Sequence, residues 1–152
     1  MPDDVTIRTA TPDDAETLAR FNRQMAEETE GKALDPETVR RGVQAIFEDP
    51  SRGFYLVAER AGTVVASLMI TTEWSDWRNG QFWWIQSVYV RPSDRRTGVY
   101  TALHRAVRKR ARGATEVCGL RLYVERGNTR ARDTYEALGM TEASYRMYEE
   151  ML

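Results

Sequence analysis

The sequence predicts a mixed α/β (α+β) fold, a mostly antiparallel sheet with helices on both faces, in one domain over residues 1–152. Three apolar stretches joined by short turn-forming sequences predict antiparallel hairpins. A long stretch of helical periodicity then leads to a fourth strand, so the third and fourth strands should run parallel. Two further helical stretches precede the hairpins. A chain of 152 residues without a linker-like segment favours a single core.

The N-terminal part predicts one strand and two helices. Val5–Arg8 alternates apolar and polar residues as a half-buried strand does. The sequence Thr11-Pro12-Asp13-Asp14 combines a capping residue, a proline and acids suited to a first helical turn, and Gly31 ends the periodic stretch. Asp35-Pro36-Glu37-Thr38 repeats this start signal, and the second helix should stop near Asp49-Pro50.

The centre of the chain predicts three strands and a long helix. The strands are Gly53–Arg60, Thr63–Trp74 and Gln81–Val90, with turn residues between them. The period then changes to 3.6, and Thr97–Arg112 should be an amphipathic helix with its basic residues away from the apolar face. A ligand site is expected at the carboxyl ends of Gln81–Val90 and of the parallel strand Cys118–Val124, where a strand-to-helix turn aims backbone N–H groups outward.

The C-terminal part predicts a strand, a helix and a last strand. These are Cys118–Val124, Asn128–Leu138 and Ala143–Glu150, with Gly139 as the helix stop. The predicted order is therefore strand, two helices, three strands, helix, strand, helix, strand.

Composition excludes several classes of protein. Hydrophobic residues make up 41% and charged residues 30%, so we expect a folded cytoplasmic protein without a membrane span. The formal net charge of −1 gives no overall attraction to nucleic acid. One cysteine and one histidine leave no internal disulfide and no zinc site, so no metal is expected. We interpret Cys118 as a small buried residue and His104 as a solvated helix residue.

A basic glycine turn follows the strand that ends at Val90. It reads Arg95-Arg96-Thr97-Gly98-Val99-Tyr100 and runs into the long helix. A phosphate at a helix N-terminus meets unpaired N–H groups and the positive end of the helix dipole, and a glycine allows close approach. Two readings stay open from the residues alone: an anion site, or a tight surface turn with solvated arginines.

This turn resembles the acyl-CoA signature of the GNAT N-acetyltransferase superfamily, Gln/Arg-x-x-Gly-x-Gly/Ala after a strand. Arg95 matches the first position and Gly98 the glycine, while Tyr100 replaces the final small residue. The element order matches the family's fold over nearly the whole chain. The resemblance implies that acetyl-CoA is the cosubstrate and that its diphosphate lies on Arg95, Arg96, Thr97, Gly98, Val99 and Tyr100. The bulky Tyr100 side chain must then point away from the diphosphate or reshape its surroundings.

A second family element starts at Asn128. In the family, the asparagine and the helix face that follows line the pantetheine arm, and a tyrosine lies near the CoA sulfur; Asn128, Ala131 and Tyr135 match these positions. Taken singly, Asn128 also fits a plain helix cap and Tyr135 a core aromatic. The resemblance implies binding by Asn128 and Ala131 and proton donation to the thiolate by Tyr135.

The family reaction is direct attack of an amine on the acetyl thioester. An alkylammonium has a pKa near 10.4, so its deprotonation at pH 7 costs about 4–5 kcal/mol. The thioester oxygen becomes negative and needs a backbone N–H donor, which the resemblance assigns to the region of Val88, Tyr89 and Val90.

The general base is where the sequence departs from the family. Many members carry a glutamate on this strand, but Gln86 stands here and can only orient a water or the amine. Glu125, Glu28 and Glu27 are alternative bases by position. We therefore expect acetyl transfer to a primary amine of a small molecule or peptide. Trp74, Trp77, Trp83 and Trp84 concentrate around one hairpin and fit an acceptor slot, a subunit contact or core packing.

Two other functions compete with the enzyme. A noncatalytic acyl-CoA-binding regulatory module is the main alternative, because Gln86 replaces a base. A nucleic-acid binder would use the basic residues of Arg105–Arg112, but helix-spaced charges are more simply a solvated face. A homodimer formed through the edge of Ala143–Glu150 and the aromatics near Trp74 is a further expectation.

Overall fold

The computed structural model describes residues 4–152, and these fall into two compact units. The first unit runs up to Leu122 and the second covers Tyr123–Leu152.

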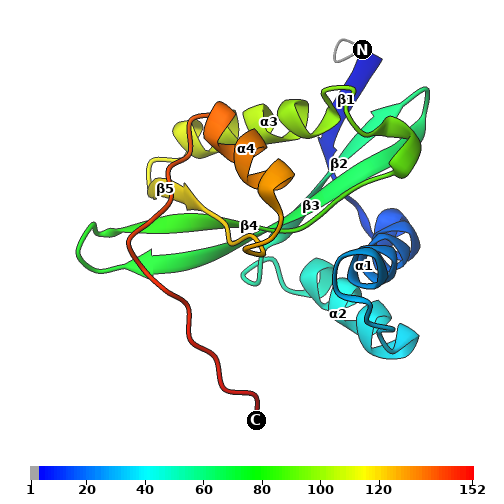
Figure 1. Ribbon diagram of the computed structural model, residues 1–152, viewed down its shortest axis with the longest axis horizontal. Helices are drawn as coiled ribbons and strands as arrows, with labels where there is room; N and C mark the ends of the chain where they lie inside the picture. The colour runs from blue at the N-terminus through cyan, green and yellow to red at the C-terminus, as the bar shows by residue number, and fades with distance from the viewer. Residues whose placement is uncertain (1–3) are drawn as a thin grey trace. The chain divides into compact units, whose positions relative to one another are not determined.

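The first unit is built on a five-stranded sheet in the order β1-β2-β3-β4-β5 (Figure 1). Its strands are β1 (Val5–Thr9), β2 (Phe54–Arg60), β3 (Thr63–Ser75), β4 (Gly80–Val90) and β5 (Val117–Arg121). Neighbours run antiparallel except β4 and β5, which are parallel because a helix connects them. The predicted mixed, mostly antiparallel sheet is confirmed.

Helices cover both faces of this sheet (Figure 1). The helices α1 (Ala15–Glu30) and α2 (Pro36–Glu48) lie on one face, and α3 (Val99–Gly113) lies on the other. Short 3₁₀ turns, η2 (Pro12–Asp14) and η3 (Pro92–Asp94), precede α1 and the turn before α3. This layering follows from the alternation of side chains along each strand, which gives two apolar faces.

The larger core lies between the sheet and α3. Leu56 and Ala58 of β2 and Leu68 and Ile70 of β3 point to this face and pack with Leu103 of α3, all completely or nearly completely buried. Burying a leucine or isoleucine side chain contributes roughly 1.5–3 kcal/mol, so these residues anchor α3 firmly to the strands. The helix that carries the glycine turn at its start is therefore fixed along its length.

The second core lies beneath α1 and α2. Tyr55 and Val57 alternate with the β2 residues of the first core and meet Leu18 of α1 and Val43 of α2. The two cores use opposite faces of the same strands. A one-residue slip in strand register would therefore move the side chains of each core to the opposite face of the sheet.

Capping residues set the starts of the helices as the sequence predicts. Thr11 and Asp14 form a capping box, in which the Thr11 N–H donates to Asp14 Oδ2 at 2.8 Å. Asp35 Oδ2 accepts from the Thr38 N–H at 2.9 Å and caps α2. Gly31 ends α1 in the left-handed region with φ of +63°.

The second unit holds one helix and no strand. The helix α4 (Thr129–Ala137) is capped by Asn128, and Gly139 follows it with φ of +97°. The predicted strand Ala143–Glu150 is wrong: these residues are exposed and have no regular secondary structure. Their apolar and polar residues alternate, but a strand needs a hydrogen-bonded neighbour, and within the described residues of this unit there is none. The predicted dimer edge built on this strand is therefore absent from the second unit.

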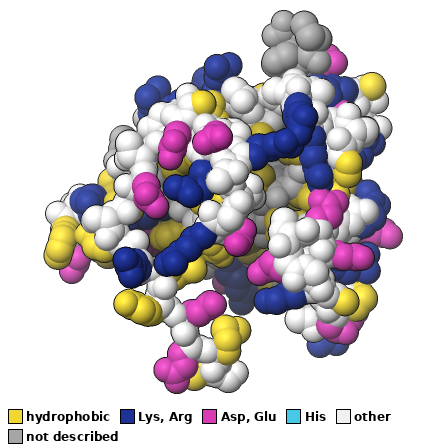
Figure 2. Space-filling view, in the orientation of Figure 1, with side chains coloured by type: hydrophobic (Ala, Val, Ile, Leu, Met, Phe, Trp, Pro, Cys, Tyr) yellow, Lys and Arg dark blue, Asp and Glu magenta, His cyan; other side chains and the backbone are white. Residues whose placement is uncertain are grey.

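Charges of both signs are spread over the visible face rather than gathered by sign (Figure 2). This agrees with 22 basic and 23 acidic residues and a net charge of −1. In the part of the chain that the structure describes, no helix has the length and apolar character to cross a membrane. Among those residues there is also no group of three or more His, Cys, Asp or Glu side chains placed to hold a metal ion.

Candidate active site

A β-bulge interrupts β4 three residues before its end. Met69 pairs with Gln86 and Ser67 pairs with Tyr89, so Ser87 and Val88 together face a single residue of β3. Ser87 has φ of +52°, an uncommon value for a residue with a side chain. Such strained bulges re-aim the backbone and are frequent next to active sites.

The bulge leaves backbone groups of β4 on an open side. The Arg91 N–H donates to the carbonyl oxygen of Val65 on β3 at 2.8 Å, so by strand alternation the N–H groups of Val88 and Val90 point away from β3. On that side β5 pairs with β4 only as far as Trp84. The end of β4 therefore presents N–H groups where no strand pairs with it, in the Val88–Val90 region predicted to hold the thioester oxygen.

The glycine turn lies directly after this strand end. Gly98 adopts φ of +85° and is the N-cap of α3, which begins at Val99. The first N–H groups of a helix have no partner within the helix, and the dipole makes this end positive. The structure thus brings together in one corner the strand end and the turn that the sequence assigned to the thioester and the diphosphate.

A buried carboxylate that the sequence analysis missed anchors the turn. Asp94 is 4% exposed and accepts from Arg60 Nη1 at 2.6 Å and Arg91 Nε at 2.8 Å, while Thr97 Oγ1 donates to its carbonyl oxygen at 2.6 Å. Burial raises the pKa of Asp94, but the hydrogen bonds from Arg91, Arg60 and Ser93 outweigh it and hold the pKa below its usual value. The spacing Arg91-x-x-Asp94 is the sequence feature that could have indicated the contact between these two side chains.

The two arginines of the turn differ in their contacts. Arg95 donates from Nη2 to Glu28 Oε2 at 2.7 Å and from Nε to the carbonyl oxygen of Val90 at 2.8 Å. Arg96 is exposed, has φ of +63°, and makes no hydrogen bond or ion pair with any described residue. Of the pair, only Arg96 has a guanidinium that is uncommitted within the described chain.

Tyr100, the departure from the family signature, is turned inward. Its ring packs against the α3 core, and its hydroxyl lies 3.1 Å from Nδ1 of His104. Arg108 Nη2 lies 3.3 Å from His104 Nε2; since a guanidinium only donates, Nε2 accepts and Nδ1–H donates to Tyr100. Of the two orientations expected for Tyr100, the structure has the one that directs the side chain into the protein.

His104 is fully buried, which contradicts the solvated position predicted for it. Burial, and next the charge of Arg108, lower its pKa from 6.5 to about 4. The unfolded chain therefore binds a proton here between pH 6.5 and 4 while the folded protein does not, and stability falls as pH falls through this window. Cys118 also contradicts its prediction, because it is exposed and not buried.

We expect the free energy of unfolding to be about 2 kcal/mol lower at pH 5 than at pH 7 because of His104 alone. Urea unfolding of wild type and His104→Gln at both pH values measures this difference. Glutamine cannot take up the proton, so the variant should lose less stability between pH 7 and 5. Equal losses in the two proteins would contradict the assignment.

On the face covered by α1 and α2, Gln86 is held rather than free. It lies opposite Met69, which packs against the α1 and α2 core, and its Nε2 donates to Thr71 Oγ1. Gln86 cannot accept a proton at neutral pH, as the sequence indicated. Of the alternative bases in the first unit, Glu28 is engaged by Arg95, and Glu27 is exposed.

The four tryptophans divide evenly between exposed and half-buried positions. Trp74 and Trp77 are 59% and 85% exposed near the tip of the β3–β4 hairpin. The rings of Trp83 and Phe54 pack edge to face with 5.3 Å between their centres. Trp84 Nε1 donates to Glu73 Oε1 at 3.0 Å. Trp83 also packs against the core between the sheet and α3, so core packing accounts for one of the four tryptophans.

The predicted pantetheine residues lie in the second unit. Asn128 Oδ1 accepts from the Ala131 N–H at 3.2 Å, so Asn128 caps α4 and the amide of Ala131 is already used. Tyr135 is half-buried one turn after Ala131, and burial raises the pKa of its phenol. The prediction that Asn128 caps a helix is therefore confirmed. The side-chain NH₂ of Asn128 is the group left to bind a ligand.

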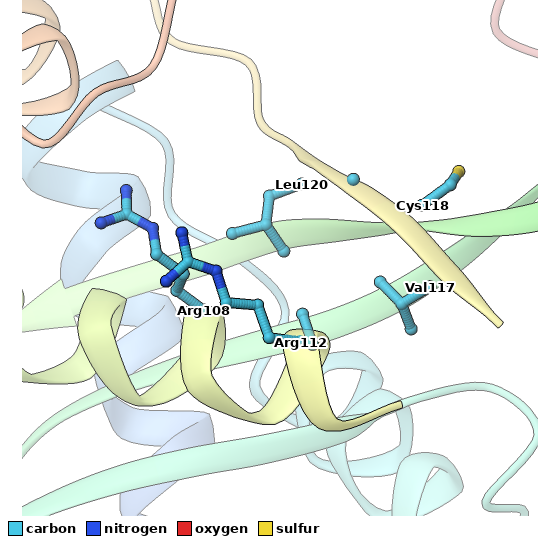
Figure 3. Close-up of a pocket in the computed structure, with 7 residues that line it drawn as sticks. Arg108, Arg112, Val117, Cys118 and Leu120 are labelled. Atoms are coloured by element: carbon cyan, nitrogen blue, oxygen red, sulfur yellow. The ribbon is translucent and has the colours of Figure 1, made fainter. Parts of the chain in front are cut away.

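A hollow of about 260 Å³ opens between the C-terminal half of α3 and β5 (Figure 3). Arg108 and Arg112 lie on its helix side, and Val117 and Leu120 on its strand side. Arg108 follows Val99 by nine residues, about 13 Å along the helix axis, so this hollow is distinct from the glycine turn.

Comparison with known proteins identifies the family. The model of the acetyltransferase (GNAT) family matches residues 17–140. The chain belongs to the acetyltransferase (GNAT) family. Members use acetyl-CoA as the acetyl donor, and acetyl-CoA is the cosubstrate. The search of curated proteins found no match.

Solved structures of GNAT proteins resemble this chain closely. A possible acetyltransferase from Clostridium difficile 630 is 45% identical with a TM-score of 0.91, and the match covers 97% of each chain. A predicted acetyltransferase with acetyl-CoA from Clostridium acetobutylicum is 17% identical with a TM-score of 0.79 over 96% of each chain. A ribosomal-protein-alanine N-acetyltransferase from Brucella melitensis biovar Abortus 2308 is 18% identical with a TM-score of 0.77, over 97% of this chain and 99% of that one. The last two show a shared fold.

The glycine turn meets the steric and electrostatic needs of the CoA diphosphate in this GNAT chain. Gly98 takes a left-handed φ at the start of a 15-residue helix, and Arg96 supplies an uncommitted cation beside it. Backbone N–H groups, a missing side chain and a positive charge are the features that anion sites at helix N-termini share. The residues present are therefore compatible with the cosubstrate.

Proposed function

We propose that this protein transfers the acetyl group of acetyl-CoA to a primary amine of a small molecule or peptide by direct attack. The observation that carries the proposal is the bulge at Ser87, which turns the Val88 and Val90 N–H groups toward the side of β4 that β5 leaves open. A pair of fixed backbone donors there suits an oxygen that becomes negative in the transition state. Membership of the GNAT family supports this use of the strand end.

In this proposal each part of the corner has its own role. The first N–H groups of α3, with Thr97, Gly98, Val99 and the backbone of Tyr100, hold the diphosphate. Arg96 adds a side-chain cation, whereas Arg95 contributes through its backbone because its guanidinium is committed to Glu28 and Val90. Outside this corner, in the second unit, Asn128 and Ala131 are proposed to bind the pantetheine arm.

The chemical roles fall to Tyr135 and Gln86. Tyr135, whose phenol stays protonated at pH 7, donates a proton to the departing thiolate. Gln86, held by Thr71, orients the amine or a water that carries its proton away. We also propose that residues 1–152 are one cytoplasmic N-acetyltransferase domain, which the family match across Leu122 and Tyr123 supports. A homodimer stays a prediction.

A noncatalytic acyl-CoA-binding module is the second candidate, favoured by an amide, Gln86, on the strand where many relatives carry a base. The deciding experiment follows release of free thiol from acetyl-CoA with amino acids, polyamines, peptides and other amines. Turnover with any primary amine supports the enzyme. CoA binding by calorimetry without turnover across the whole panel supports the module.

The contacts of the two arginines predict unequal effects on CoA binding. Arg96→Ala should weaken CoA affinity about tenfold, because it removes one charge-assisted contact to the diphosphate. Arg95→Ala should weaken it less than about threefold, since the guanidinium is held by Glu28 and Val90. Isothermal titration calorimetry compares the two. A larger loss for Arg95→Ala would refute the assignment.

A further inference from the structure

Glu28, in the last turn of α1, connects that helix to the corner formed by β4 and the glycine turn. Its Oε2 accepts from Arg95 Nη2 at 2.7 Å, and its Oε1 accepts from the Tyr89 hydroxyl at 3.2 Å. These partners lie 67 and 61 positions further along the sequence. One carboxylate thus holds both a strand residue and a turn residue.

Arg95 completes the link from the other side. Its Nε donates to the carbonyl oxygen of Val90 at 2.8 Å, and its guanidinium carbon lies 5.4 Å from the centre of the Tyr89 ring. The Val90 carbonyl oxygen points away from β3, because the N–H of the same peptide, that of Arg91, donates to Val65 on β3, and β5 does not extend to this part of β4. Arg95 therefore joins the last carbonyl group of the strand to the turn.

Tyr89 is fixed at both ends by α1. Its ring, 4% exposed, contacts the ring of Phe21 at 4.9 Å, and its hydroxyl reaches Glu28. Tyr89 lies between Val88 and Val90, whose N–H groups the proposed function assigns to the thioester oxygen. A shift of about 1 Å in such donors is enough to cost a large part of the rate.

We propose that Glu28 is a positioning residue for acetyl transfer, which holds Arg95 and Tyr89 so that the Val88–Val90 donors keep their alignment with the glycine turn. This inference rests on the proposed function. Glu28 acts through Arg95 and does not take the amine proton, because the guanidinium occupies its Oε2.

The ion pair between Arg95 and Glu28 contributes little to the stability of the fold, and its role is to position the groups that it contacts. The side chains of Arg95 and Glu28 are 42% and 39% exposed. Exposed ion pairs contribute about 0–1 kcal/mol to stability, so removing this one leaves the fold intact. The effect should therefore appear in the geometry and the rate.

The test compares Glu28→Gln with Glu30→Gln, which removes the same charge from the same turn of α1 at an exposed residue whose one ion pair within residues 4–152 is with Lys32. In Glu28→Gln we expect kcat to fall about tenfold while CoA affinity is unchanged or rises, since a freed Arg95 and one negative charge fewer favour the diphosphate. Hydrogen exchange of the amides in residues 87–96 should become at least about threefold faster than in Glu30→Gln.

Arg95→Gln separates positioning from proton transfer. It should reproduce the loss of kcat, and the double variant Glu28→Gln/Arg95→Gln should be no slower than the slower single variant. Loss in Glu28→Gln without loss in Arg95→Gln would make Glu28 a base and overturn the proposal. The proposal would also be overturned if Glu28→Gln had the same hydrogen-exchange rates and the same kcat as Glu30→Gln. If the wild-type protein turns over no amine, the proposed function fails. Hydrogen exchange alone then tests whether Glu28 holds Arg95 and Tyr89 in place.

Discussion

Gly98→Asp should weaken CoA binding about 100-fold, or about 2.7 kcal/mol. Gly98 is the N-cap of α3 with φ of +85°, where the diphosphate is proposed to approach the backbone. Aspartate adds a side chain and a negative charge at this position. At an effective dielectric constant of 20, two like charges about 4 Å apart repel by about 4 kcal/mol, so the charge alone is large enough.

Gly98→Asn is the matched control for this variant. Asparagine has nearly the same size, and both residues tolerate the left-handed region better than other side chains. Both should therefore carry the same backbone strain, and the difference between them in calorimetric CoA affinity reports the charge. If Gly98→Asp binds CoA as tightly as wild type does, the diphosphate does not lie at this turn.

The parts of the fold that the sequence predicts correctly depend on local signals. Caps such as Thr11 and Asp35 and the stop at Gly31 act within a few residues, so their chemistry is readable from neighbouring positions. The hairpins are likewise marked by their turns. For the same reason the glycine turn, with Gly98 before a periodic stretch, was recognisable without a structure.

The features that were missed depend on partners far away in the sequence. The bulge at Ser87 exists only because of its register against β3, and the residues of β4 themselves give no sign of it. Asp94 is anchored by Arg60, 34 positions earlier, and Arg95 by Glu28, 67 positions earlier. A sequence shows that such charges exist but not which of them meet.

Two wrong predictions share a different cause, which is that a pattern fits more than one environment. His104 lies one residue after Leu103 and four after Tyr100, and a neutral imidazole with two partners can be buried as readily as an apolar side chain. The alternation in Ala143–Glu150 fits a strand, but pairing decides whether a strand forms. Hydrophobic periodicity alone does not contain that information.

Tyr135→Phe should lower kcat about 100-fold and leave acetyl-CoA affinity and the melting temperature nearly unchanged. A phenol with its pKa raised by burial stays protonated at pH 7, so it can donate to the departing thiolate without an activating group. A thiolate with a pKa near 8.5 benefits from such a donor as the carbon–sulfur bond breaks. Phenylalanine keeps the ring and removes only the hydroxyl.

The matched control is Tyr145→Phe, which deletes the same group from an exposed tyrosine, 72% accessible, in the same unit. Steady-state kinetics at saturating acetyl-CoA and amine measure kcat, and calorimetry measures affinity. A solely structural Tyr135 would leave kcat unchanged in Tyr135→Phe, because phenylalanine keeps the ring and its packing. Wild-type kcat in Tyr135→Phe would assign the residue to packing in α4 and leave departure of the thiolate to solvent or another donor.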